Sequence, residues 1–92
     1  MQIRRTKEFA IWLSSLRDRQ GRAKIIDRLE EGNPRKTRSV GAGVVEMKID
    51  FGPGYRVYFV QRGDVVIVLL CGGDKSTQDN DIQRAKALAD ML

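Results

Sequence analysis

The 92-residue chain contains no histidine and one cysteine, Cys71, and these shortages exclude several kinds of catalytic and metal site. Without histidine, the usual general base of serine and cysteine hydrolases is missing, and an ordinary zinc site has too few ligands. One cysteine cannot form a disulfide within the chain. Because Cys71 ends an apolar run, we expect a buried structural thiol at this position.

Long apolar stretches are also missing from the sequence. The longest run, from Val65 to Cys71, is far shorter than the roughly 20 residues that cross a bilayer. The N-terminus, MQIRRTKEF, lacks the apolar core of a signal peptide. The sequence therefore predicts a soluble, cytoplasmic protein without a membrane partner, and its length allows a single domain spanning residues 1–92.

Sequence motifs of cofactor-dependent and metal-dependent enzymes are absent. No segment has the form GxxxxGK[ST], which cradles nucleotide phosphates. The acidic group at residues 79–81 lies where a helix is expected to begin, and acidic side chains are favoured there by the helix dipole. We therefore expect no metal ion and no cofactor.

Basic residues are abundant but unevenly placed. The chain has 17 Lys and Arg residues against 12 Asp and Glu, and the net charge of +5 comes from residues 1–50. An asymmetry of this kind fits a polyanion, or an acidic protein partner, bound to one side of the molecule. An ordinary solvated basic surface is the alternative.

Two amphipathic helices are predicted in the first third of the chain. Thr6 is a suitable N-cap, and apolar residues at helical spacing follow over residues 6–18, namely Phe9, Trp12, Leu13 and Leu16. Gly21 is expected to interrupt the pattern, after which Ala23, Ile26 and Leu29 mark a second helix that ends at the Gly32-Asn33-Pro34 stop. Two short, closely spaced helices should form an antiparallel hairpin.

Strand patterns dominate the middle of the chain. The segment PRKTRSVGAG, residues 34–43, has no periodicity and is expected to be a basic loop. Apolar and polar residues then alternate over 44–50 and again from residue 55, on either side of a glycine–proline turn, which predicts a hairpin. Residues 65–71 are apolar throughout, as is typical of a central strand covered on both faces.

The remaining segments complete the predicted fold. Residues 72–77 should form a loop leading into a last helix, and residues 1–5 can add a strand. The expected order is β-α-α-β-β-β-α, with an antiparallel sheet of three to four strands, an N-terminal helical hairpin and a C-terminal helix. The predicted class is therefore α+β.

The hairpin register places two cations opposite each other. Matching the apolar faces of the two strands puts Lys48 across from Arg56, and Glu46 across from Tyr58. Like charges in a cross-strand pair destabilise a sheet, so we interpret Lys48 and Arg56 as converging on an anion, with phosphate as the preferred candidate. The alternative is that both side chains extend into solvent and bond Glu46 and Asp50.

These groups suit the cleavage of RNA, in which the ribose 2′-hydroxyl is the nucleophile. Arg56 and Lys48 would stabilise charge on the phosphate, and Lys75, in the loop after the central strand, would close the site. A lysine crowded by other cations has a lowered pKa, which suits proton transfer. Tyr58 would donate a proton or stack on a base.

The strings GVVEMKIDFGPGYRVYF (43–59) and LLCGGDKSTQ (69–78), followed by DIQRAKALA (81–89), resemble the RelE/ParE superfamily of bacterial toxins. The similarity is strongest to the HigB-like branch of "addiction module killer proteins" and covers nearly the whole chain. It implies a RelE-like fold and a type II toxin–antitoxin toxin that a cognate antitoxin, usually a helix-turn-helix protein encoded beside it, neutralises. Many relatives are ribosome-dependent mRNA endoribonucleases, or mRNA interferases, that need no metal.

The resemblance selects the same cations as the charge argument, namely Arg56, Lys75 and Lys48. Lys48 replaces an arginine that is common in the pattern, so the charge is kept and the bidentate fork is lost. Some relatives also carry a catalytic tyrosine or histidine near the C-terminus, and this chain has neither after Tyr58. Proton transfer would then fall to Lys75, Lys48 or Tyr58.

Two further expectations follow from the resemblance. ParE-like members of the fold poison DNA gyrase without being enzymes, so a gyrase poison is the alternative function. The expected partners of a nuclease are the ribosome, mRNA and the antitoxin, with operator DNA bound only through the antitoxin complex. Basic residues of the second helix and the following loop would contact RNA, an acidic antitoxin segment or operator, and the candidates are Arg22, Arg35, Lys36 and Arg38.

Overall fold

A computed structural model of the chain describes residues 2–31, 36–64 and 66–92. The elements run in the order β1 (Gln2–Arg5), α1 (Lys7–Ser15), α2 (Arg19–Glu31), β2 (Thr37–Gly41), β3 (Val44–Ile49), β4 (Tyr55–Arg62), β5 (Val66–Gly73), a 3-10 turn (Lys75–Thr77) and α3 (Gln78–Asp90). The N-terminal helical hairpin, the sheet and the C-terminal helix confirm the α+β class. Within the described ranges, no helix has the length and apolar character needed to span a bilayer.

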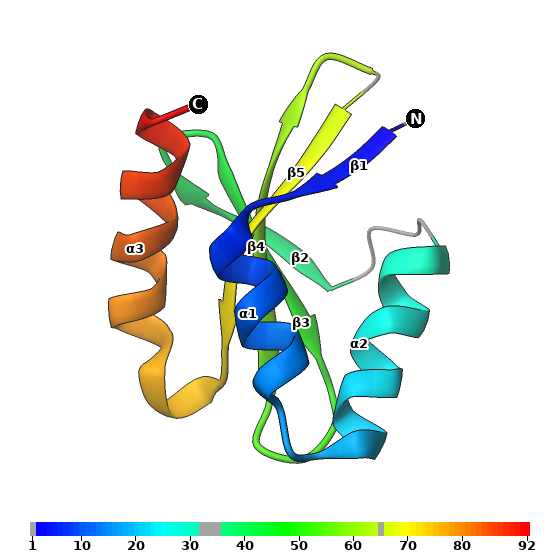
Figure 1. The fold of residues 1–92 in the computed structure, drawn as a ribbon. Coiled ribbons are helices and arrows are strands. Elements are labelled where there is room, and N and C mark those ends of the chain that lie inside the picture. The colour runs from blue at the N-terminus through cyan, green and yellow to red at the C-terminus, as the bar shows by residue number, and fades with distance from the viewer. Residues whose placement is uncertain (1, 32–35, 65) are drawn as a thin grey trace.

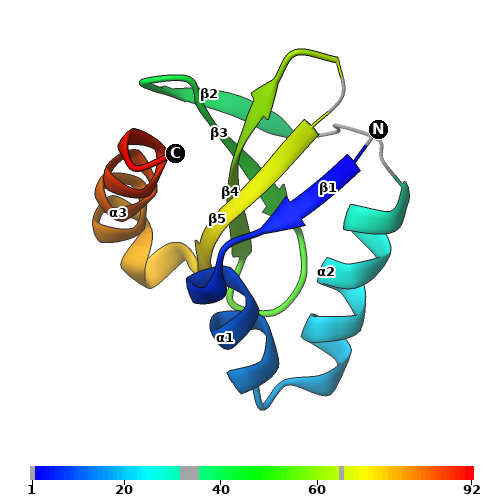
Figure 2. The same cartoon turned by 45° about the horizontal axis from the view of Figure 1, so that its top comes forward.

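The strands form one five-stranded sheet in the order β1-β5-β4-β3-β2. Strands β2 to β5 are an antiparallel meander, and β1 pairs in parallel with β5, so the sheet is mixed. Helices α1 and α2 lie on one face and α3 lies on the other (Figures 1 and 2). Strand β4 is therefore central and is covered on both faces.

The sheet has one strand more than the upper limit of the sequence prediction. The prediction of a loop over 34–43 is wrong for β2, because Thr37, Arg38 and Ser39 pair with residues of β3. This short polar strand lies at the edge of the sheet, where one neighbour supplies its hydrogen bonds and no apolar periodicity is needed. Arg35, which precedes this strand in the sequence, lies outside the described residues.

Helix α1 begins as the sequence predicts and ends earlier. The Thr6 hydroxyl oxygen accepts a hydrogen bond from the backbone N–H of Phe9 at 3.0 Å, which confirms the N-cap. The break between the helices comes at residues 16–18, and Gly21 lies inside α2. Gly21 is needed for close packing, because a Cβ there would lie 2.5 Å from a side-chain atom of Asp18 and of Tyr55.

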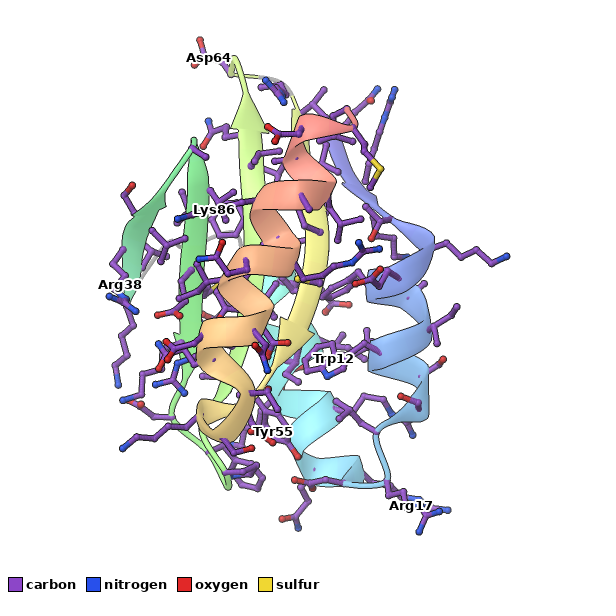
Figure 3. The ribbon with its side chains drawn as sticks, turned by 90° about the vertical axis from the view of Figure 1, so that its left-hand side faces the viewer. Trp12, Arg17, Arg38, Tyr55, Asp64 and Lys86 are labelled. Carbon is purple, nitrogen blue, oxygen red and sulfur yellow. The ribbon has the colours of Figure 1, made fainter. Side chains whose placement is uncertain are left out.

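Two separate cores lie on the two faces of the sheet. The core under the helical hairpin contains Phe9, Leu13, Ile25, Met47, Ile49, Tyr55, Val57 and Leu69. The core under α3 contains Val44, Tyr58, Val60, Leu70, Cys71, Ala85, Leu88 and Ala89. Figure 3 shows α3 lying in front of the sheet and running roughly along the strands, with Trp12 on the side of α1. Both Tyr58 and Arg56 belong to strand β4 and are buried by this arrangement.

Candidate active site

The β3–β4 hairpin has the register that the sequence predicts. Lys48 pairs with Arg56, Glu46 with Tyr58, and Met47 with Val57. Because side chains of directly paired residues project from the same face of an antiparallel sheet, Lys48 and Arg56 leave the sheet on the same side. A shared anion site for Lys48 and Arg56 requires this common side of the sheet.

Lys48, Arg56 and Lys75 line one open pocket of about 370 Å³. The β3–β4 turn forms the rest of its wall, with Asp50, Phe51, Gly52, Pro53 and Gly54. The three cations come from separate strands or loops, and the fold brings them together at one end of the sheet. The positive charge of the pocket is suited to a phosphate group.

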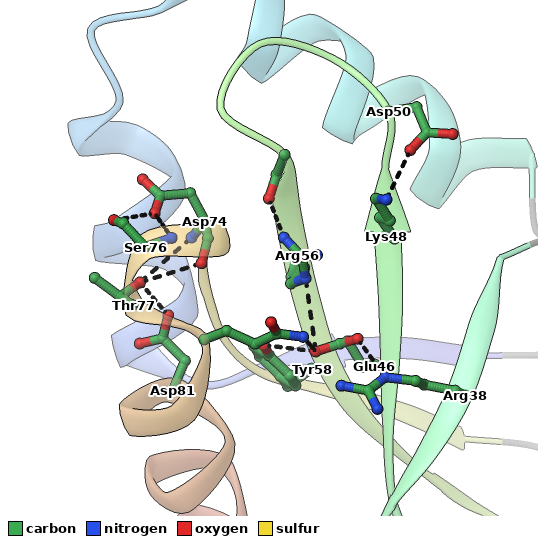
Figure 4. Close-up of polar contacts among 12 residues, drawn as sticks. Arg38, Glu46, Lys48, Asp50, Arg56, Tyr58, Asp74, Ser76, Thr77 and Asp81 are labelled. Atoms are coloured by element: carbon green, nitrogen blue, oxygen red, sulfur yellow. Dashed lines mark hydrogen bonds and ion pairs between the residues drawn. The ribbon is translucent and has the colours of Figure 1, made fainter.

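Lys75 reaches the pocket because the strand end and the hairpin turn touch. The backbone N–H of Lys75 donates to the carbonyl oxygen of Pro53 at 3.4 Å. Asp74 caps the 3-10 turn, and its carboxylate accepts from the backbone N–H of Ser76 at 2.8 Å, as Figure 4 shows. The predicted position of Lys75 near Arg56 is confirmed, whereas its catalytic role stays a prediction.

Arg56 is a buried cation with an unusual set of contacts. Its residue is only 6% exposed, and Nη1 donates to the carbonyl oxygen of Gly54 at 2.7 Å. Its Nε atom is buried without a hydrogen-bond partner in the described structure, and Glu46 Oε2 lies 3.8 Å away. A buried N–H of this kind is costly, so the site is better satisfied once a ligand or a small movement supplies an acceptor.

Glu46 is the centre of a buried polar network under α3 (Figure 4). Its carboxylate accepts hydrogen bonds from Arg38 Nε at 2.8 Å, the Tyr58 hydroxyl at 2.9 Å and Gln78 Nε2 at 2.9 Å. Burial by itself raises the pKa of Glu46, but these hydrogen bonds outweigh it and hold the pKa below its ordinary value. Glu46 is therefore a buried anion between two arginines.

The alternative pairing of the two cations is partly present. Lys48 Nζ lies 3.5 Å from Asp50 Oδ1, and Arg56 forms the longer ion pair with Glu46. Lys48 extends toward Asp50 and away from Arg56 (Figure 4). Arg56, however, is not in solvent, so only Lys48 behaves as an ordinary exposed cation.

Tyr58 lies in the network but not at the surface. Its residue is 0% exposed, so the ring offers no face on which an RNA base could stack in this arrangement. Burial, reinforced by the adjacent Glu46 carboxylate, raises the pKa of the phenol well above its ordinary value. Tyr58 therefore stays protonated and supports Glu46, and direct contact between its phenol and RNA requires the site to open.

The four predicted RNA-binding residues do not form one patch. Lys36 pairs with Asp50 at the pocket wall, and Arg38 binds Glu46, so these two flank the site. Arg22 lies on α2, on the opposite face of the sheet. Arg35 lies outside the described residues.

Sequence reasoning did not place Glu46 and Gln78 among the functional residues. Glu46 was expected only as an alternative partner in solvent, because the face of β4 that carries Arg56 was not recognised as covered. A signal was present, since Val44 and Val60 alternate onto the same face and the last helix has an apolar stripe. Among the described residues, no group of three or more acidic or cysteine side chains is placed to hold a metal ion.

Comparison with known proteins assigns the chain to a family. Residues 12–90 match the family "Phage derived protein Gp49-like (DUF891)", so the chain belongs to this family, which is a RelE-like toxin family. The chain is also 50% identical to an uncharacterized protein of Haemophilus influenzae, over 100% of this chain and 96% of that relative. Family membership indicates a toxin-like protein of the toxin–antitoxin type, with a cognate antitoxin as its partner.

Proposed function

We propose that the protein is the toxin of a HigB-like type II toxin–antitoxin system and acts as a ribosome-dependent mRNA endoribonuclease. The observation that carries the proposal is the meeting of Lys48, Arg56 and Lys75 in one pocket. Three cations around an open pocket can stabilise the negative charge that develops during phosphoryl transfer. This role needs neither a metal ion nor histidine.

In the proposed reaction, the ribose 2′-hydroxyl gives its proton to solvent water and attacks the adjacent phosphate, so that the P–O5′ bond breaks and a 2′,3′-cyclic phosphate forms. Arg56 binds a non-bridging phosphate oxygen, and its buried position fixes the direction of its charge. Lys75, which is exposed at the pocket rim, protonates the departing 5′ oxygen. Lys48 neutralises the second non-bridging oxygen after releasing Asp50.

The ribosome would position the RNA, because the pocket by itself does not hold a base. The pocket is open, and its walls offer a partly exposed Phe51 but no deep cleft for a base. Positioning of the message by the ribosomal decoding site would bring the scissile phosphate and the 2′-hydroxyl into line. The exposed Lys36 and Arg38 beside the pocket would then contact RNA phosphates.

The antitoxin is proposed to be a helix-turn-helix protein encoded beside the toxin. It would neutralise the basic first half of the chain, and operator DNA would be bound through the complex. Co-purification of the two gene products, followed by restored toxicity when the neighbouring gene is deleted, tests this partnership.

The decisive experiment maps RNA 5′ ends in cells after induction of the toxin. New cuts in translated messages are expected with the wild-type protein, and both the cuts and the growth arrest should disappear with Arg56→Ala. Addition of purified protein to programmed ribosomes should reproduce the cuts. Intact messages during full growth arrest, accompanied by DNA double-strand breaks, would instead identify a gyrase poison.

A further inference from the structure

We infer that Glu46 is a positioning residue for Arg56: its buried carboxylate holds the guanidinium in the orientation that binds an anion in the pocket. The inference deepens the proposed function and rests on it for one point, that the pocket binds phosphate. Glu46 itself does not line the pocket, so it would act through Arg56.

The carboxylate is fixed far more firmly than a surface ion-pair partner. Glu46 is 4% exposed and accepts hydrogen bonds from three different elements: β2 through Arg38, β4 through Tyr58 and α3 through Gln78. An acidic side chain is seldom buried unless it is paired. Its oxygens therefore have a defined position relative to strand β4.

The guanidinium of Arg56 has one hydrogen bond at its Nη1 end and an ion-pair contact, without a hydrogen bond, at its Nε end. Nη1 donates to the carbonyl oxygen of Gly54 at 2.7 Å, and Nε faces Glu46 Oε2 at 3.8 Å. The bond to Gly54 uses one of the five N–H donors of the guanidinium, so the fork keeps donors for a phosphate. Without the carboxylate, the Nε end loses its ion-pair partner, and the planar fork can turn.

Two roles for Glu46 predict opposite effects on anion binding. If Glu46 were only a nearby negative charge, its removal would make the pocket more positive and would tighten anion binding. If Glu46 orients Arg56, its removal should weaken binding even though a negative charge has been lost. The sign of the change therefore separates positioning from simple electrostatics.

The experiment compares Glu46→Gln with Asp50→Asn in the full-length protein. Asp50 also carries a carboxylate beside the pocket, but it is exposed and pairs with Lys36 and Lys48. The probe is a short 2′-O-methylated oligoribonucleotide, which binds but cannot be cleaved through its 2′ oxygen. Binding is followed by fluorescence anisotropy at constant salt, with Arg56→Ala as the reference for loss of the anion site.

We expect Glu46→Gln to weaken binding by about tenfold or more, the scale of one charge-assisted hydrogen bond. Asp50→Asn should leave binding equal or tighter. In ¹⁵N-edited NMR, the Nε–H signal of Arg56 should shift on probe binding in the wild type and lose its distinct position in Glu46→Gln. Tighter binding by Glu46→Gln, with the Arg56 signal unchanged, would overturn the inference.

A second variant keeps the inference testable if Glu46→Gln does not fold. Gln78→Ala removes one donor to Glu46 and leaves its charge, with Gln83→Ala as the exposed control on the same helix. Weaker binding by Gln78→Ala alone supports positioning, and unchanged binding contradicts it.

If Arg56→Ala itself binds normally, the anion pocket and the nuclease proposal fail together, whereas failure of Glu46→Gln alone removes only the positioning role.

Discussion

Arg56 donates a hydrogen bond from Nη1 to the carbonyl oxygen of Gly54, 2.7 Å away, so its guanidinium folds back over the turn that precedes its own strand. Gly54 has a φ of +77°, and a Cβ at this residue would lie 3.3 Å from Nη1 and 3.7 Å from Lys75 Cβ. The conformation of the turn and the position of the positive charge are therefore linked.

Gly54→Ala should reduce RNA cleavage as well as stability, and Gly43→Ala is a matched control. Gly43 has nearly the same φ, +76°, but open space around its Cβ position. Both variants should lose about 1 kcal/mol in the free energy of unfolding from left-handed backbone strain. Only Gly54→Ala should also lower the cleavage rate, by about tenfold or more, because Arg56 is displaced.

Urea unfolding and cleavage on programmed ribosomes measure the two effects separately. Equal cleavage by Gly54→Ala and Gly43→Ala would show that the turn does not position the guanidinium.

Arg56→Lys should be nearly as inactive as Arg56→Ala, although it keeps the charge. Lysine lacks the planar fork and cannot bond Gly54 and a phosphate at the same time. We expect a loss of about 100-fold in cleavage rate, the scale for removing one oriented donor from a transition state. Arg62→Lys, at the exposed end of the same strand, should retain the wild-type rate; substantial activity of Arg56→Lys would show that charge alone suffices.

Neither tyrosine should ionise in the folded protein below about pH 11. Burial, strengthened by the Asp18 carboxylate, raises the pKa of Tyr55 to about 12, and burial beside Glu46 raises that of Tyr58 further. Because the unfolded phenols have pKa values of about 10, the unfolded state releases protons first as the pH rises. The stability contributed by both phenols is thus complete below pH 10 and is lost as the pH rises above it.

Absorbance at alkaline pH, recorded together with circular dichroism, checks this prediction. Tyrosinate should appear in the same transition as unfolding. Ionisation of one phenol near pH 10 with the fold intact would contradict the buried position of Tyr55 or Tyr58.

Cys71 should be unreactive in the native protein. It is 4% exposed, and burial raises the pKa of its thiol to about 12, so the reactive thiolate is scarce at neutral pH. A disulfide reagent should therefore label the native protein far more slowly than the urea-unfolded chain. Labelling at similar rates in the two states would mean that the α3-side core opens readily.

Local patterns predicted a large part of the fold. The Thr6 cap, the apolar stripe of α1 and the β3–β4 register follow from side-chain spacing along one or two neighbouring segments. Strand β2 could not be predicted in this way, because its hydrogen bonds come from β3 and its residues show no periodicity. The parallel partner of β1 likewise depends on a contact far along the chain.

The residues of the candidate site likewise fall into those that local patterns could place and those that they could not. Lys48 and Arg56 could be placed together because the strand register is a local property, and Lys75 because it follows a strand end. The covering of the Arg56 face by α3 could not be seen locally, so Glu46 and Tyr58 were expected to be accessible.

The sequence by itself determined the α+β class, the hairpin register and the set of cations, because periodicity and turn residues act over short distances. Only the tertiary structure decided which side chains of strand β4 are exposed to solvent and which are buried. That outcome depends on packing α3 against the sheet, which turns Glu46 from a surface acid into the buried partner of Arg56.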